Sequence, residues 1–419
     1  MSDRLNRRAA GQTPLELLEL MMRRAAEREP QNYFIGILDE YARQHALSNE
    51  AIAAFLGIET RRPWLRLALC GRPRVPRHTF WPDVQAIAAE TGADPDRLVT
   101  LVRTVEALQA LRELSIQRTA NERGALAAAR DRTDDLGGQV TSADAPYMDA
   151  VATETLPLWL DAGSQMAITD FWEAAGASTP EPSFLERDAL RSLPCLVIYL
   201  PHLALSRIEG WLASHEILYR FPCPNRYLRG CLLAYRGYGL IFIDSEDTVN
   251  EQCYTLAHEL VHLILDYLRP RGEAIARLGP DVAEVLDGQR PATHEEQVNA
   301  VFEQVSIDGY FHLLDRAGTT SHGAALRPKG AWLDASVRAA ETVADRIALE
   351  LLAPRDVVMA RLAELGISNL GNDQARFIAA THEVLQQDYQ LPQQPALVYA
   401  ATLASAFTAP TLENWLDDL

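Results

Sequence analysis

His258 and His262, with Glu259 between them, form the part of this sequence best suited to chemistry. Histidines four residues apart project from one face of a helix, one turn from each other, where two imidazoles can bind one zinc ion. Glu259 points to the side of that pair, from which its carboxylate can reach a metal-bound water without binding the metal. The spacing therefore predicts a zinc site at which Glu259 acts as a base.

The surroundings of these three residues are apolar. Within residues 256–265 the two histidines and the glutamate are the only polar side chains, which predicts a buried helix. A buried charge or imidazole is costly unless it is paired or bound to a metal. The setting thus favours a metal site over a chance occurrence of the pattern His-Glu-x-x-His.

A third zinc ligand is expected from another element, because catalytic zinc sites use three protein ligands and leave one position open for water. Residues 341–354 read as a helix with small and apolar residues on its inner face and a proline after its end. Glu341 and Asp345 lie one turn apart on this helix, so one can bind the metal while the other hydrogen-bonds a ligand histidine. The alternative is that these carboxylates lie on the surface and pair with Arg338 or Arg346.

Length and composition indicate a globular protein. At 419 residues the chain is long enough for about two or three domains. No apolar run approaches the roughly 18 residues that cross a membrane, and the N-terminus lacks the apolar stretch of a secretory signal. The five cysteines are scattered and form no Cys-x-x-Cys pair, which is typical of free thiols in a reducing compartment. We therefore expect a cytoplasmic protein that does not bind a membrane.

The net charge of −18 is unevenly distributed. Residues 1–132 contain 20 arginines and 17 acidic residues, a balance of +3, which leaves −21 for the rest of the chain. Residues 61–77 contain six arginines and no acidic residue. Because an acidic body repels nucleic acid, any DNA binding must be confined to the first part of the chain.

The first hundred residues read as short helices joined by small loops. Residues 47–58 resemble the second helix and turn of the phage-repressor (XRE) type of helix-turn-helix domain. The residues that follow, up to 74, resemble the recognition helix of that domain and the loop after it. Residues 87–94 resemble the end of its fourth helix and the turn that follows. The resemblance implies DNA binding. The arginines that it places near DNA are Arg61, Arg62, Arg66, Arg72 and Arg74. The alternative is a small helical bundle that only mediates contacts, because Pro63 and Trp64 stand where the recognition helix usually has small polar residues.

The middle of the chain changes character twice. Residues 103–135 are rich in Ala, Arg and Glu and predict a connecting helix, and residues 147–175 predict one or two more. Residues 178–183 read as a linker. Three strands are expected after it, at residues 195–200, 231–235 and 240–244. Strands that lead into a metal-binding helix fit a compact α+β zincin.

The two metal-site segments, residues 252–265 and 341–354, resemble those of the ImmA/IrrE family of zinc metallopeptidases. The strands before the zinc helix are similar to the sheet of that family. The residues assigned by this resemblance are the zinc ligands His258, His262 and Glu341 and the catalytic base Glu259. Members commonly cleave phage-repressor-type transcription factors, often after stress, and some carry such a DNA-binding domain in the same chain.

Two features depart from the pattern of that family. The gap between His262 and Glu341 is much longer than usual and implies an insertion, and Asp345 stands where asparagine is common. Within the insertion, Glu296 weakly imitates the third-ligand motif but lacks its Leu-Leu-x-Pro ending. The histidines of the insertion are candidate oxyanion partners or surface residues: His294, His312 and His322.

We therefore expect an α+β protein in which a helical helix-turn-helix domain and a helical linker precede a zincin-like domain with a small sheet packed on the histidine helix. The expected boundaries are 1–30 for an N-terminal tail and helix, 31–104 for the helix-turn-helix domain, 105–183 for the linker, 184–400 for the metallopeptidase domain with an insertion at about 268–335, and 401–419 for a C-terminal tail.

The main hypothesis is an intracellular zinc endopeptidase, fused to a DNA-binding domain, that cleaves a repressor-like protein and so controls transcription. Zinc would lower the pKa of its water to about 7, and Glu259 would accept the proton. One alternative is a transcription regulator whose zinc-peptidase-like domain senses a ligand, holds a homodimer or is catalytically silent. Another is a zinc hydrolase that acts on a non-peptide substrate.

Overall fold

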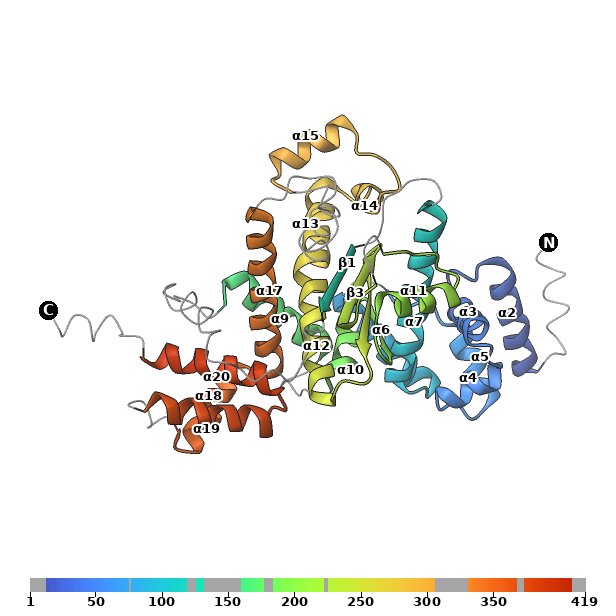
Figure 1. Ribbon diagram of the computed structural model, residues 1–419. Coiled ribbons are helices and arrows are strands. Elements are labelled where there is room, and N and C mark those ends of the chain that lie inside the picture. The colour runs from blue at the N-terminus through green and yellow to red at the C-terminus, as the bar shows by residue number, and fades with distance from the viewer. Residues whose placement is uncertain are drawn as a thin grey trace.

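The computed structural model describes residues 13–74, 77–118, 126–131, 160–176, 184–221, 225–305, 331–367 and 373–408. The fold is mostly helical α+β, with one small sheet at its centre (Figure 1). The N-terminal helices lie at one end of the molecule and the C-terminal helices at the other. The expected fold class is confirmed.

The N-terminal part is a bundle of short helices, as the sequence predicted. Ser48 caps one of them by accepting a hydrogen bond from the backbone N–H of Ala51 at 3.2 Å. Gly57, with a φ of +74°, lets the chain turn after that helix. The bundle consists of α2 (Pro14–Arg28), α3 (Phe34–His45), α4 (Asn49–Phe55), α5 (Arg61–Leu69), α6 (Arg77–Thr91) and the first half of α7 (Pro95–Arg118).

Helix α7 belongs to both parts of the molecule, so the expected boundary at residue 104 falls inside a helix. Leu98 and Val102, in its first half, pack in the N-terminal bundle, whereas Leu108 and Leu111, in its second half, pack on the sheet. Between them, Arg103 is fully buried and donates from Nε to the carbonyl oxygen of Leu190 at 3.1 Å. The helix therefore holds the bundle directly against the sheet.

The sheet has four strands in the order β1-β3-β4-β2. Strands β3 (Leu228–Tyr235) and β4 (Tyr238–Asp244) form an antiparallel hairpin, whose turn residues Arg236 and Gly237 both have positive φ. Strand β2 (Cys195–Leu200) is parallel to β4. The three strands predicted from the sequence are confirmed.

Strand β1 (Leu126–Asp131) corrects the later part of the connecting helix predicted over residues 103–135, whereas residues 103–118 are helical within α7. It pairs antiparallel with β3, with Arg130 opposite Gly230. Alanines favour a helix locally, but the free edge of β3 offers unpaired backbone groups that this segment satisfies. Residues 119–125, 132–159 and 177–183 of the expected linker lie outside the described residues, and α9 (Ala162–Ala175) is the described helix after β1.

Both faces of the sheet are covered. Alternate residues of β3 point to opposite sides: Leu232 and Ala234 pack with α12 (Val249–His262), whereas Cys231 and Leu233 pack with α11 (Leu205–Ser214) and the second half of α7. The expected packing of the sheet on the histidine helix is confirmed, and it fixes that helix against a rigid surface.

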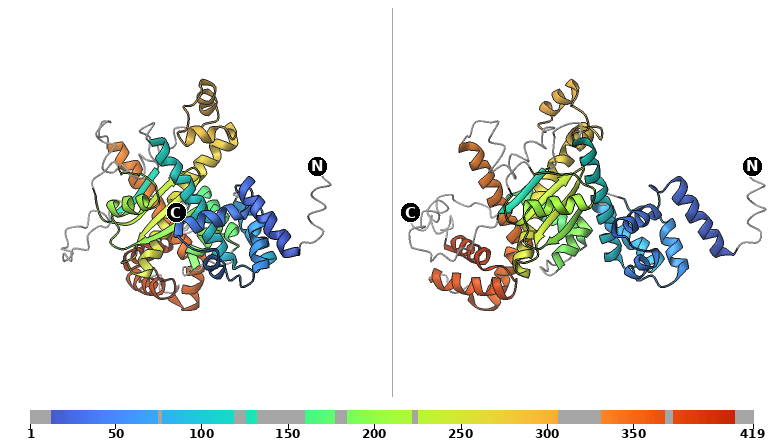
Figure 2. Two further views of the ribbon diagram at one scale, coloured as in Figure 1. Left: turned by 90° about the vertical axis from the view of Figure 1, so that its right-hand side faces the viewer. Right: turned by 45° about the vertical axis from the view of Figure 1, so that its right-hand side comes forward.

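The chain after α12 continues in the same direction as a π-helix, η2 (Leu263–Leu268), and then α13 (Arg269–Leu278). The described part of the insertion adds α14 (Val282–Leu286) and α15 (His294–Phe302), which lie at the far end of α13 in Figures 1 and 2. Its residues 306–330, with His312 and His322, lie outside the described residues.

The last helices close the molecule on the other side. α10 (Leu185–Ser192) lies just before β2 in the chain, and α17 (Ala331–Leu352) lies beside α12. α18 (Arg355–Glu364), α19 (Gln374–Gln387) and α20 (Gln393–Thr408) follow, and α20 extends into the tail expected from residue 401. Within the described part of the chain, no helix is both long and apolar enough to cross a membrane.

Candidate metal centre

Helix α12 begins with a capping box. The backbone N–H of Glu251 donates to Oγ1 of Thr248 at 3.3 Å, and the backbone N–H of Thr248 donates to Oε2 of Glu251 at 3.1 Å. Its second half is buried between the sheet and α17, and His258, Glu259 and His262 are each at most 3% exposed. The predicted helix and its burial are thus present, and the histidines share one face.

Helix α17 brings Glu341 to the two histidines. Oε2 of Glu341 lies 3.2 Å from Nε2 of His258, and Oε1 lies 3.6 Å from Nε2 of His262. The two Nε2 atoms are 3.1 Å apart. Among the described residues these three side chains form a group, with ligand atoms within 4.8 Å of one another, that could hold a metal ion.

The separations fit a tetrahedral zinc ion. Ligand atoms about 2.0–2.1 Å from a tetrahedral zinc lie roughly 3.3 Å from one another. The two Nε2 atoms are 3.1 Å apart, and the two carboxylate oxygens of Glu341 each lie near a different Nε2 atom, at 3.2 and 3.6 Å. Two imidazoles and one carboxylate are also a donor set that zinc accepts at catalytic sites. The residues present therefore suit zinc.

The other ring nitrogen of each histidine is held by a carboxylate. Nδ1 of His258 donates to Oδ1 of Asp345 at 2.9 Å, and Nδ1 of His262 donates to Oδ2 of Asp266 at 2.7 Å. The hydroxyl of Tyr254 also donates to Oδ1 of Asp345, at 2.9 Å. A proton fixed on Nδ1 leaves the lone pair on Nε2, so both carboxylates orient the histidines for metal binding. Asp345 has the position expected for it.

Asp266 was not predicted as a site residue, although its spacing from His262 indicates that its carboxylate can reach that histidine. It lies four residues after His262, the same step that separates the two histidines. On a continuing helix that step places its carboxylate beside the imidazole. The helix does continue here, through the π-helical turn η2, and Asp266 stays largely buried, with 15% of its side chain exposed.

Electrostatics at the centre favour a protonated His262 beside an ionised carboxylate. Burial alone would lower the pKa of His262, but hydrogen bonds to Asp266 and Glu341 outweigh it and raise the pKa to about 10. The pKa of His258 is also raised, because Asp345 and Glu341 together outweigh burial. Burial would raise the pKa of Glu341, but the two histidines hold it well below its usual range. A divalent cation would replace these protons and keep the charge of Glu341 compensated.

Glu259 lies beside this group rather than within it. Its side chain is buried between α12 and β3, where it contacts the backbone at Gly230. That this carboxylate reaches a metal-bound water stays a prediction.

Glu296 does not join the site. It caps α15, and Arg290 donates to its Oε1 from Nη2 at 2.6 Å, which lowers the pKa of Glu296 to about 2. The alternative third ligand is therefore corrected: this carboxylate is held by Arg290 at the start of α15. His294 is on the same first turn and is exposed.

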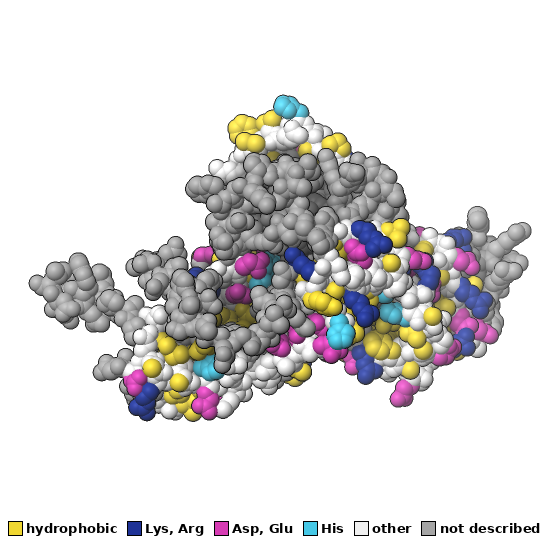
Figure 3. Space-filling model, viewed as in Figure 1, with side chains coloured by type: hydrophobic (Ala, Val, Ile, Leu, Met, Phe, Trp, Pro, Cys, Tyr) yellow, Lys and Arg dark blue, Asp and Glu magenta, His cyan; other side chains and the backbone are white. Residues whose placement is uncertain are grey.

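The five arginines predicted to approach DNA fall into two groups. Arg61, Arg62 and Arg66 are exposed on α5, and two of them form ion pairs: Arg61 with Glu19 at 2.7 Å and Arg66 with Glu90 at 2.9 Å. On the face shown in Figure 3, basic and acidic side chains alternate over the described N-terminal helices.

Arg72 and Arg74 lie in the loop after α5, and their approach to DNA stays a prediction. Nε and Nη2 of Arg74 donate to the two carboxylate oxygens of Asp83 at 2.9 and 2.8 Å. Arg72 is half-buried against Gly36 of α3, and its charge is attracted by Glu106 of α7. The loop after α5 therefore packs on the protein itself, because α6 and α7 supply carboxylates there.

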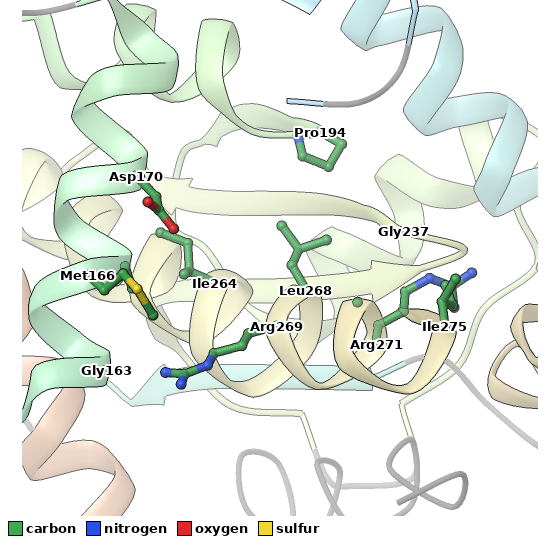
Figure 4. A pocket seen from close by; sticks show the side chains of 12 residues that line it. Gly163, Met166, Asp170, Pro194, Gly237, Ile264, Leu268, Arg269, Arg271 and Ile275 are labelled. Carbon is green, nitrogen blue, oxygen red and sulfur yellow. The ribbon is translucent and has the colours of Figure 1, made fainter. Parts of the chain in front are cut away.

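A separate pocket of about 700 Å³ lies against η2. Figure 4 shows Met166 and Asp170 of α9 on one side of it and Ile264 and Leu268 of η2 on the other. Its lining is mainly apolar, and Asp266, which holds His262, belongs to the same turn of η2. A molecule in this pocket would therefore contact the helix that carries the metal centre.

The fold and the site define an α+β domain with an HExxH metal centre. Residues 219–284 match the peptidase M78 family model, described as the IrrE N-terminal-like domain. The matched segment includes the hairpin of β3 and β4 and all of α12. The chain thus contains an IrrE N-terminal-like domain with a His-His-Glu group suited to a metal ion. No curated protein and no solved structure matched the chain.

Replacing Asp266 by asparagine is expected to weaken zinc affinity by about 10- to 100-fold, because His262 loses the carboxylate that orients and polarises it. Competition with a chromophoric chelator measures this. The matched control is Glu273→Gln, in an exposed ion pair with Arg269 one helix further on. Equal zinc affinity of Asp266→Asn and the control would contradict the role of Asp266.

Zinc binding is expected to release a proton from His262 even at about pH 8, because its raised pKa of about 10 keeps the metal-free imidazole protonated there. Apparent zinc affinity should therefore keep rising with pH until about 10, the pKa of His262. Titration calorimetry in buffers with different ionisation enthalpies counts the protons. Histidines with an ordinary pKa of about 6.5 would release almost none at this pH, and that result would contradict the electrostatics described above.

Proposed function

We propose that this protein is a zinc-dependent endopeptidase. The observation that supports it is the convergence of His258, His262 and Glu341, with Glu259 buried beside them. When bound by these ligands, zinc would supply a water of lowered pKa and polarise a peptide carbonyl. Asp345 and Asp266 keep the Nδ1 protons of the histidines in place, so that Nε2 stays available.

Glu259 is the general base in this proposal. Its carboxylate accepts the proton of the attacking water and then delivers it to the nitrogen of the leaving amine. The burial of Glu259 excludes bulk water from its carboxylate, which strengthens its electrostatic interactions.

For the substrate, we propose a repressor-like protein whose cleavage changes transcription in the cytoplasm. The support is the IrrE N-terminal-like match together with the helical bundle at the N-terminus. In this proposal the bundle is a helix-turn-helix domain that binds DNA through α5, where Arg61, Arg62 and Arg66 are exposed. The exposed ion pairs of Arg61 and Arg66 are worth little and can open when phosphates approach.

A second candidate is a transcription regulator in which the zinc domain senses a small molecule. The pocket against η2 favours it, because its size falls within the range of about 300–1,000 Å³ common for ligand sites. Binding there would act on the turn that carries Asp266. This candidate predicts DNA binding that is unaffected by Glu259→Gln, and a second copy of the chain as partner.

Glu259→Gln is expected to lower the cleavage rate by about 10²- to 10⁴-fold while zinc stays bound, because only the proton acceptor is removed. The zinc-loaded full chain is incubated with repressor-like proteins from the same genome and with a quenched-fluorescent peptide library. Glu246→Gln, an exposed carboxylate before α12, is the control. Cleavage by the Glu259 variant at the rate of this control would refute the proposed mechanism.

Arg62→Ala and Arg66→Ala are each expected to weaken DNA binding and to reduce the salt dependence of the binding constant by about one phosphate contact. The measurement uses DNA selected from a random duplex library and titrated at several salt concentrations. Arg361→Ala, on α18 at the opposite end of the molecule from the bundle, is the control. If the full chain selects no DNA, the bundle serves only protein contacts.

A further inference from the structure

We propose that Gly230 of β3 is a positioning residue for Glu259. This inference rests on the proposed function, in which Glu259 is the general base. It concerns a residue outside the His-Glu-x-x-His pattern, on a different element from the two ligand helices α12 and α17.

The space that a side chain would need at Gly230 is already occupied. A Cβ atom on this residue would lie 2.8 Å from Oε1 and 3.2 Å from Cγ of Glu259, and 2.5 Å from Cγ2 of Thr255. Non-bonded carbon atoms prefer separations of about 3.5–4.0 Å, so two of these contacts lie far inside the repulsive range. Thr255 and Glu259 are one turn apart on α12, and both lie against the bare backbone of Gly230.

Glycine in the interior of a strand is unfavourable, and its presence often marks a close approach of another group. The other residues of β3 on this face, Leu232 and Ala234, carry side chains that pack in the core. Gly230 itself is buried and paired on both sides, with Arg130 of β1 and Ile243 of β4. The pairing with β4 is regular here, the pairing with β1 shifts register just beyond Arg130, and the missing side chain makes room for Glu259.

The consequence is a defined position for the carboxylate. The backbone of β3 forms a wall on one side of Glu259, and β3 is held by two neighbouring strands. A general base must stay within hydrogen-bond reach of the proton that it accepts, and a displacement of about 1 Å can reduce the rate about 10²-fold. Gly230 therefore fixes how close the carboxylate of Glu259 lies to β3.

Gly239 of β4 provides a matched control. It is buried in the strand beside β3, and a Cβ on it would lie 2.8 Å from Cδ1 of Leu263 and 3.2 Å from Cδ1 of Leu232. An alanine at either position therefore overfills the contact between the sheet and the helix α12–η2. Only at Gly230 does the added methyl group meet Glu259.

The first measurement is thermal unfolding of the full chain in a double-mutant cycle. Gly230→Ala and Gly239→Ala should each lower the unfolding midpoint by a few degrees, since overpacking is destabilising. In a chain that also carries Glu259→Ala, Gly230→Ala should lower the unfolding midpoint by less, because the added methyl group no longer meets the carboxylate of Glu259. Gly239→Ala should lower the unfolding midpoint by the same amount whether residue 259 is glutamate or alanine.

The second measurement is catalysis by the zinc-loaded full chain on the best-cleaved member of a quenched-fluorescent peptide library. Gly230→Ala should lower kcat by about 10- to 100-fold with KM and zinc affinity unchanged. Gly239→Ala should keep kcat within about twofold of the unmodified protein, because overpacking there meets no reacting group. A merely structural role of Gly230 would make the two variants alike.

The outcomes separate this inference from the proposed function. If Gly230→Ala matches Gly239→Ala in both measurements while Glu259→Gln is inactive, the role of Gly230 is refuted and the peptidase proposal stands. If Glu259→Gln cleaves as fast as the unmodified protein, both are refuted. Coupling to Glu259 in the unfolding cycle together with a selective loss of kcat supports the inference.

Discussion

The contact between α12 and α17 is the interaction on which the function of this structure depends. It buries two imidazoles beside the carboxylate of Glu341, more than seventy residues away in the chain. Burying these groups without compensation would be costly. Here each imidazole has a carboxylate on either nitrogen, so charges of opposite sign offset the loss of hydration. The same arrangement fits a divalent cation, which links the stability of the core to metal binding.

The sheet fixes the orientation of α12 at this contact. Side chains of β3 and β4 pack against α12 on one face, while α7 and α11 cover the other. A helix held along its length by a sheet cannot rotate without breaking that packing, so the histidines keep their direction. Gly230 carries no side chain at this surface, and the space that it leaves is filled by the side chain proposed as the base.

Helix α7 joins this centre to the N-terminal bundle as one packed body. Its apolar residues enter both cores, and the fully buried Arg103, whose guanidinium carbon lies 3.6 Å from the centre of the Phe80 ring, sits where the two meet. Such a junction resists bending, because separating the bundle from the sheet would expose apolar surface of α7. In the proposed regulator, a change at the metal centre would reach the bundle through the sheet and α7.

The sequence by itself determined the local features: the helix of the two histidines, the three strands before it and the helix of Glu341. Each of them follows from periodicity, capping and residue type, which act over a few residues. Only the tertiary structure decided that Asp266 holds His262, that Arg72 is half-buried against Gly36, and that residues 126–131 complete the sheet. These outcomes depend on partners distant in the chain, and pairing with them outweighs the local preference of each segment.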